Sequence, residues 1–305
     1  MELKHIIRVW RRFIGYVMFR FCSLIICFIP AASIRHIAKA LAGIGYILAG
    51  RHRKIALNSL EFAFAQSLNA KEKTKIAKDS FRHTVTSGLE LIFCIEHPGY
   101  VKSLIKIEGK HNLDNALHKG KGVISVTAHF GNFPLMQLGL AQEGYRVNSI
   151  IRHMRDPQAE RYFLKKRNQM NVKTIYNEPR NICIAESLRS LKNNEVLFIL
   201  LDQNFGTGGV FVDFFNRKAA TATGPIILAK RSKATIVPMF IVHNEDGTHR
   251  LIIEPEFVLE DKGTGEENIS SNIQRLTDII ENYIRKFPSE WSWIHRRWKT
   301  QPKSK

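Results

Sequence analysis

The chain has 305 residues, of which 44% are hydrophobic, so it can bury a substantial core and is neither disordered nor fibrous. Its formal net charge of +19 predicts a negatively charged partner, such as a nucleic acid, an anionic membrane surface or an acidic carrier protein. Because the sequence contains no zinc-finger spacing and no recognisable nucleic-acid-binding motif, a membrane is favoured over a nucleic acid.

The N-terminal segment is basic and then apolar. Its basic side chains are Lys4, Arg8, Arg11 and Arg12. Residues 13–32 follow as an apolar run of about the 20 residues that cross a bilayer. The length of this run and the presence of Arg20 argue against a cleaved signal peptide. Three alternatives remain: a spanning anchor, a helix lying in the membrane interface, and a soluble core helix with a basic cap.

Residues 37–49 form a second apolar segment, which is too short to span a membrane. A basic helix start follows at residues 51–54, and basic residues beside two apolar segments fit a membrane-facing surface. We therefore expect two parts: membrane-anchoring or interfacial helices in residues 1–50, and one globular domain in residues 51–305.

The four cysteines form no CxxC pair and lie in apolar or helical surroundings. They are Cys22, Cys27, Cys94 and Cys183. This pattern predicts small buried hydrophobic residues in a reducing compartment, and no disulfide framework or metal site.

Strands and helices alternate from residue 105 onward. Apolar runs rich in β-branched residues predict strands at 105–108, 123–128, 146–151, 172–176, 196–201, 234–242 and 249–255. Helical periodicity or capping signals predict helices at 71–93, 113–117, 133–140, 157–170, 181–193, 223–231 and 269–286. The alternation predicts an α/β fold, a single domain whose central mixed or largely parallel sheet is flanked by helices.

Three polar residues, His129, Arg152 and Asp202, follow predicted strands directly. Ligands of open α/β sheets bind at the carboxyl ends of the strands, so this shared position indicates a site. Each residue alone is more often a structural cap or ion-pair partner. Gly131 and Asn132 then predict a turn and a helix cap, where backbone N–H groups can hold a developing negative charge.

Two later segments leave their roles open. The glycine-rich stretch 206–216, which contains Asp213, matches neither phosphate-binding glycine pattern. The tail at 291–299 interleaves three tryptophans with basic residues. That composition is typical of nucleic-acid stacking or of an aromatic and basic belt at a membrane interface, and the apolar N-terminal segment favours the belt.

The sequence resembles the lipid A biosynthesis lauroyl and myristoyl acyltransferases, within the lysophospholipid acyltransferase superfamily. The block TAHFGNF at 127–133 resembles the histidine motif of that family. Further matching blocks follow in the family's order: Arg152 with DP at 156–157, LDQ at 201–203, VFVDFF at 210–215, GP at 224–225 and FPSEWSWIHRRW at 287–298. The resemblance implies a membrane-anchored enzyme on the cytoplasmic face of a bacterial inner membrane, which moves a fatty acyl chain from an acyl thioester to a lipid hydroxyl.

One position departs from the family pattern of His, four residues, then Glu or Asp. Here that position is Pro134, which has no acid. Asp202, which also matches an acidic position of the family, and Asp213 are the nearby substitutes. The departure is compatible with an acid supplied from elsewhere, with a different acceptor, or with lost activity.

The resemblance implies a mechanism in which His129 is the general base on the acceptor hydroxyl. Asp202 would hold the imidazole or bind the acceptor, and Arg152 would bind a phosphate or polarise the thioester carbonyl. Backbone N–H groups of Gly131 and Asn132 would form part of an oxyanion hole. We expect no metal and no cofactor beyond the donor thioester, carried by an acyl carrier protein or by coenzyme A.

Asp213 and Arg161 complete the predicted substrate-binding residues. Arg161 opens a basic helical stretch, 161–167, which is either a solvated face or a docking surface for an acidic acyl carrier protein. The expected partners are a membrane lipid acceptor and an anionic phospholipid surface, with no nucleic acid. Two rival classes are a non-catalytic lipid-binding pseudo-enzyme, suggested by Pro134, and a basic nucleic-acid-binding protein.

Overall fold

The computed structural model describes residues 2–65, 67–261 and 263–302. Four helices come first: α1 (Glu2–Phe28), α2 (Ala31–Leu48), α3 (Gly50–Phe64) and α4 (Ala70–Glu96). The later helices are α5 (Val101–Leu104), α6 (Lys110–His118), α7 (Phe133–Gln142), α8 (Pro157–Gln169), α9 (Arg180–Lys192), α10 (Gly224–Ser232) and α11 (Gly265–Lys286), with 3-10 turns η1 (Pro98–Tyr100), η2 (Gly206–Gly208) and η3 (Pro288–Glu290). The side chains of Lys4, Arg8, Arg11 and Arg12 lie outside the described residues.

The strands form one large sheet and one small one. They are β1 (Ile105–Glu108), β2 (Val123–Thr127), β3 (Val147–Ile151), β4 (Val172–Tyr176), β5 (Val196–Leu200), β6 (Val210–Phe214), β7 (Arg217–Thr221), β8 (Thr235–His243) and β9 (His249–Ile253). The seven-stranded sheet has the order β1-β9-β8-β2-β5-β3-β4, and β6 pairs with β7. Strands β8, β2, β5, β3 and β4 are parallel, and β9 is antiparallel to β8. The prediction of an α/β fold with a largely parallel central sheet is confirmed.

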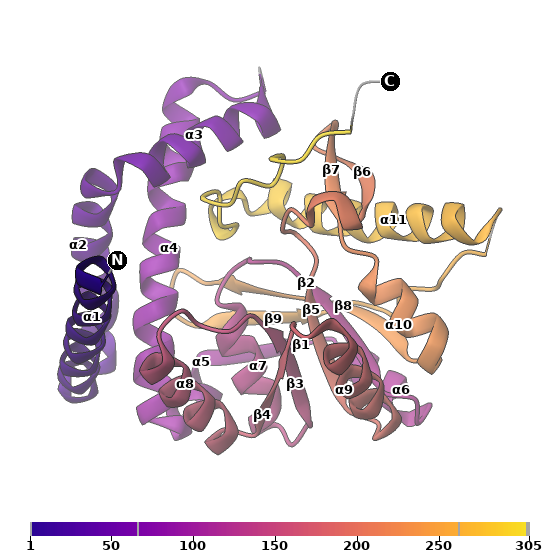
Figure 1. The fold of residues 1–305 in the computed structure, drawn as a ribbon, viewed down its shortest axis with the longest axis horizontal. Coiled ribbons are helices and arrows are strands. Elements are labelled where there is room, and N and C mark those ends of the chain that lie inside the picture. The colour runs from indigo at the N-terminus through magenta and orange to yellow at the C-terminus, as the bar shows by residue number, and fades with distance from the viewer. Residues whose placement is uncertain (1, 66, 262, 303–305) are drawn as a thin grey trace.

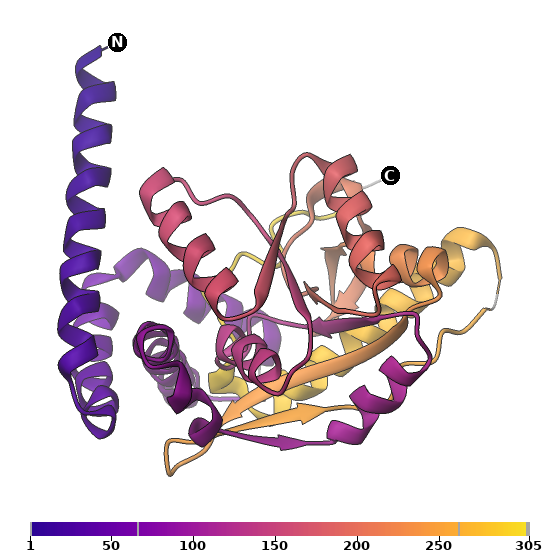
Figure 2. The same cartoon turned by 90° about the horizontal axis from the view of Figure 1, so that it is seen from below.

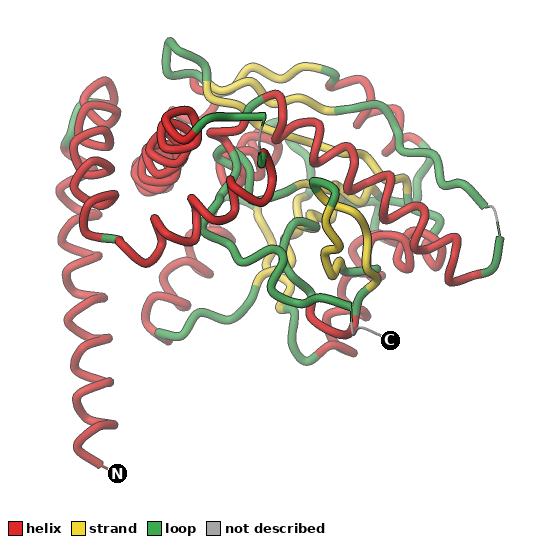
Figure 3. The backbone as a smooth tube through the Cα atoms, turned by 90° about the horizontal axis from the view of Figure 1, so that it is seen from above, coloured by secondary structure: helices red, strands yellow, loops and turns green. Residues whose placement is uncertain are grey.

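Helices cover both faces of the sheet, so its central strands are buried on both sides (Figures 1 and 3). On one face, Val123 of β2 and Val196 of β5 pack with α6, α7 and the end of α4. On the other face, Ile124 and Leu197, the next residues along the same strands, pack with α9, α10, α11 and the C-terminal tail. This alternation follows from the two-residue repeat of a strand.

The two N-terminal helices stand beside α4 at one side of the domain, and α1 extends well beyond it (Figures 1 and 2). Phe19 of α1 packs against Tyr162 and Phe163 of α8, with ring centroids 5.6 and 5.4 Å apart. Among the helices that the structure describes, none is both long enough and apolar enough to cross a membrane.

A stripe of apolar side chains is nevertheless exposed on α1 and α2. On α1 it comprises Trp10, Phe13, Ile14, Val17, Met18, Phe21, Leu24, Ile25 and Phe28, and on α2 it comprises Leu41, Ile44, Ile47 and Leu48. The spacing of three and four residues along α1 places these side chains on one face of the helix.

Two sequence interpretations are corrected by burial. Trp291 and Trp293 are 0% exposed and Trp298 is 8% exposed, so the tryptophans of the tail belong to the core. They are available neither to a membrane interface nor to stacking on nucleic acid. All four cysteines are free as predicted, but only Cys94 is buried, and Cys22 is exposed.

Candidate active site

The three polar residues predicted at strand ends lie at one edge of the sheet. His129 follows β2, Asp202 follows β5 and Arg152 follows β3, and these strands are parallel neighbours in the order β2-β5-β3. Their carboxyl ends therefore face the same side of the molecule. Asp202 lies one strand from His129, and Arg152 lies two strands away, about 10 Å across the sheet.

Asp202 holds His129 in a fixed orientation. Its Oδ1 lies 2.9 Å from His129 Nδ1, and its Oδ2 accepts the backbone N–H of His129 at 2.9 Å. Oδ2 also accepts a hydrogen bond from Trp291 Nε1 at 2.7 Å. Since a carboxylate can only accept, Nδ1 carries the proton, and Nε2 of a neutral imidazole keeps its lone pair.

Asp202 is only 2% exposed, whereas the side chain of His129 is 22% exposed. Burial alone raises the pKa of the Asp202 carboxyl, but the His129 charge and the hydrogen bonds from His129 and Trp291 outweigh it and lower that pKa below its ordinary value. The site thus has a buried acid, ionised at neutral pH, behind an imidazole that reaches the surface.

Two further side chains surround the imidazole. Gln203 Nε2 lies 3.0 Å from His129 Nε2, so the amide of this exposed residue meets the free lone pair. The His295 ring lies 4.7 Å from the His129 ring, and burial, followed by the charge of His129, lowers the pKa of His295. His295 is therefore uncharged at neutral pH.

The C-terminal tail completes the site, which sequence reasoning did not anticipate. Besides the bond from Trp291 to Asp202, Ser292 N–H donates to the carbonyl of His129 at 3.0 Å. Arg297 is 0% exposed and donates to the carbonyl of Gln203 at 3.0 Å. Burial lowers the pKa of Arg297 to about 10, so the guanidinium stays charged at neutral pH and fixes the strand end that carries Asp202. The sequence signals for this tail were the alternation of tryptophan and basic residues and the match of residues 287–298 to a block of the resembled family.

The turn after His129 is held by close contacts and hydrogen bonds within the fold. Gly131 has φ +55°, and a Cβ there would lie 1.9 Å from the carbonyl oxygen of Ile241. The Gly131 N–H donates to the carbonyl of Glu290 at 2.9 Å, so it is not free to bind an oxyanion. The prediction that this N–H lines an oxyanion hole is wrong for this geometry.

Asn132 is likewise committed to the fold. It is 0% exposed, and its Oδ1 accepts the N–H of Leu135 and so caps α7. Its Nδ2 donates to Glu90 Oε2 at 3.0 Å. Pro134, where the family has an acid, lies in the first turn of α7, where a missing N–H costs nothing. The carboxylate that meets the imidazole comes instead from Asp202.

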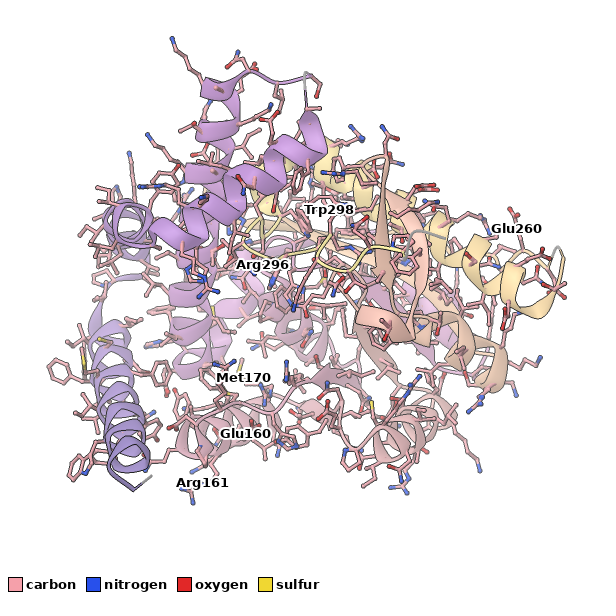
Figure 4. All side chains as sticks on the ribbon, turned by 45° about the horizontal axis from the view of Figure 1, so that its top comes forward. Glu160, Arg161, Met170, Glu260, Arg296 and Trp298 are labelled. Carbon is pink, nitrogen blue, oxygen red and sulfur yellow. The ribbon has the colours of Figure 1, made fainter. Side chains whose placement is uncertain are left out.

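The remaining predicted residues lie apart from His129 or contact nothing in the site. Arg152 is exposed and makes none of the hydrogen bonds or ion pairs described for this structure. Arg161 is exposed on α8 and points outward (Figure 4). Asp213 is exposed on the small sheet, where it pairs with Lys218 at 3.0 Å.

A second buried polar cluster, which we call the histidine cluster, lies behind the turn. It consists of His83 and Glu90 of α4, His243 of β8, His249 of β9 and Glu290 of η3. Burial lowers the pKa of His83 to about 4 and that of His243 to about 3, and it raises the pKa of Glu290. The search for polar residues directly after predicted strands did not identify these five residues.

Comparison with known proteins agrees with the motif order. Residues 2–300 match the model of the bacterial lipid A biosynthesis acyltransferases. The chain belongs to this family.

Individual relatives agree with that family. The lipid A biosynthesis palmitoleoyltransferase of Escherichia coli K12 is 30% identical over 83% of this chain and 80% of its own length. The lipid A biosynthesis lauroyltransferase of the same organism is 24% identical over 83% of this chain and 80% of its own length. Among solved structures, the 1-acyl-sn-glycerophosphate acyltransferase of Thermotoga maritima matches with a TM-score of 0.38 and 13% identity, covering 78% of this chain and 97% of that one. The family model and the two named relatives of Escherichia coli confirm the prediction that the chain is an acyltransferase of lipid A biosynthesis.

Proposed function

We propose that this acyltransferase moves a fatty acyl chain from an acyl thioester to a hydroxyl of a lipid A precursor or related glycolipid, with His129 as the general base. The observation that carries the proposal is the pairing of the buried Asp202 carboxylate with His129 Nδ1 at 2.9 Å. This pairing fixes the tautomer in which Nε2 can accept a proton, as in the acid–histidine pair of hydrolases.

The reaction balances without a metal or a covalent enzyme intermediate. The acceptor hydroxyl takes the place of the Gln203 amide at His129 Nε2 and gives up its proton as its oxygen attacks the thioester carbonyl. The new C–O bond forms and the C–S bond breaks. The proton then passes from the imidazolium to the departing thiolate, and the Asp202 charge stabilises the imidazolium between these two steps.

Arg152 supplies positive charge at the same sheet edge. It lies about 10 Å from β2, a distance that a long arginine side chain and a phosphate-bearing substrate can bridge together. Its exposed guanidinium has no ion-pair partner among the described residues, so it is free to bind an acceptor phosphate or the thioester oxygen. This role is part of the proposal.

Membrane attachment completes the proposal. The exposed apolar stripe of α1 and α2 would lie in the headgroup region, where apolar burial and the attraction of anionic lipid for a chain of charge +19 both favour binding. We place the enzyme on the cytoplasmic face of the inner membrane, where it would meet an acyl thioester of an acyl carrier protein or of coenzyme A. The exposed basic residues of α8, such as Arg161 and Lys165, would contact an acidic carrier.

The test is mass spectrometry of lipids from cells that lack the gene, complemented with the wild type, His129→Ala or His118→Ala. His118 is an exposed histidine of α6 and serves as the matched control. We expect one acylated lipid to vanish without the protein, to return with the wild type and with His118→Ala, and to stay absent with His129→Ala. Full restoration by His129→Ala would overturn the histidine mechanism, and no lipid change in any strain would favour the pseudo-enzyme.

A further inference from the structure

Three residues of the histidine cluster, His83, His243 and Glu290, bring metal-ligating atoms together from three separate elements. His83 Nδ1 lies 3.5 Å from Glu290 Oε1, and His243 Nδ1 lies 2.7 Å from Glu290 Oε2. The rings of His83 and His243 are 4.4 Å apart. One ligand atom of each of these three residues lies within 4.8 Å of the others. Ligands of a tetrahedral zinc ion are about 3.3 Å apart, so a tetrahedral site requires distances in this set to change by up to about 1.5 Å.

We propose that His83, His243 and Glu290 provide three of the four ligands of one divalent transition-metal ion of the zinc type, at a site behind the turn that carries His129. Two imidazole nitrogens and one carboxylate are a donor set that suits zinc and disfavours calcium or magnesium. The side chain of Glu290 is 5% exposed, and every ion pair described for it is with a histidine. A divalent cation would compensate this buried negative charge.

A second layer of polar groups surrounds these ligands. His249 Nε2 lies 2.9 Å from Glu90 Oε2, and both residues have a ligand atom within 4.8 Å of one on His243. Ser87 Oγ lies 3.5 Å from His243 Nε2. Ser87 is therefore positioned as the kind of partner that metal-bound histidines usually have on the second ring nitrogen, which orients the ring. An ion would enter from the side of His83, the most exposed of the three ligands at 18%.

The proposed metal site lies next to the turn that carries His129, so a bound ion would stabilise that turn. The carbonyl of the ligand Glu290 accepts the N–H of Gly131, two residues after His129, and the next residue, Trp291, donates to Asp202. An ion would therefore tie the tail to α4 and β8 and hold the turn that carries the base. The site rests on the geometry of the cluster and does not depend on the proposed reaction.

The test is the zinc content of the full-length protein, purified in detergent from zinc-supplemented cells and passed through a desalting column. We expect about one zinc per chain, which a chelator removes and added Zn²⁺ restores with a rise in the unfolding temperature. Substitution of Co²⁺ should give the visible absorption of a four-coordinate site. Wild-type protein that retains no zinc and shows no thermal shift with Zn²⁺ overturns the proposal, whatever the variants do.

Variants then test the ligand set. His83→Gln and Glu290→Gln should each lose the zinc, whereas His118→Gln, at an exposed histidine of α6, should keep it. His249→Gln should keep the ion with an affinity lowered by about tenfold to a hundredfold, as expected for an outer partner. Loss of zinc from His249→Gln together with full retention by His83→Gln would show that the proposed ligands are wrong.

Discussion

Replacing Asp202 by Asn removes the charge behind His129, the proposed general base, while it keeps nearly the same side-chain shape. The carboxylate accepts three hydrogen bonds, two from His129 and one from Trp291, and an amide can accept from only some of these donors. The amide NH₂ also favours the opposite tautomer of His129, in which Nε2 carries the proton and cannot act as a base.

The magnitude follows from the geometry. An imidazolium 2.9 Å from a carboxylate gains about 6 kcal/mol at an effective dielectric constant of about 20. Desolvation offsets part of this gain, and loss of the equivalent acid in hydrolase triads costs about 10⁴-fold in kcat. We therefore expect Asp202→Asn to lower kcat about 10³- to 10⁴-fold with little change in KM.

The assay follows the thiol released from an acyl thioester donor, with purified protein and acceptor lipid in mixed micelles. Asp278→Asn, on the exposed face of α11, is the matched control and should stay within about twofold of the wild type. Unfolding by urea checks that both variants are folded. A folded Asp202→Asn variant that keeps more than a tenth of the wild-type rate would refute the role of the carboxylate.

Three further outcomes follow from the same region. Trp291→Phe removes one hydrogen-bond donor to Asp202 and should lower kcat about tenfold without changing KM, because one charge-assisted hydrogen bond is worth about 1.5–3 kcal/mol. An unchanged kcat would mean that the indole of Trp291 contributes only packing. Gly131→Ala forces a Cβ onto the carbonyl of Ile241 and should cost about 3–5 kcal/mol of unfolding free energy, measured by urea unfolding. Gly120→Ala is the control and should cost about 1 kcal/mol, because φ is also positive there but no atom lies within 4 Å of the added Cβ. Equal losses for the two variants would show that the contact with Ile241 does not destabilise the protein. The pKa of Asp202 is lower in the folded state than in the unfolded state, where it is about 3.9, so its contribution is complete above that value and is lost as pH falls toward the folded pKa. The difference in unfolding free energy between the wild type and Asp202→Asn should therefore shrink between pH 6 and pH 3, as followed by tryptophan fluorescence, and a constant difference would exclude the shift.

The sequence by itself determined the local elements and the candidates for the base and its acid. Helix and strand periods, and caps such as Asp156, which accepts the N–H groups of Gln158 and Ala159 at 2.9 Å, depend on neighbours in the chain. His129 and Asp202 could be singled out because each follows a buried strand, and parallel strands carry their ends to one edge. Pro134 removed the expected acid, and Asp202 was already one of two substitutes.

Only the tertiary structure decided which of these residues meet. The insertion of β5 between β2 and β3 places Asp202, not Arg152, against His129, and no local pattern encodes strand order. Composition made the tail resemble a membrane belt, but burying Trp291 requires contacts with residues far away in the chain. The histidine cluster joins residues 83 and 290 for the same reason. Propensity acts over a few residues, whereas hydrogen bonds between distant segments exist only after the chain has collapsed around its sheet.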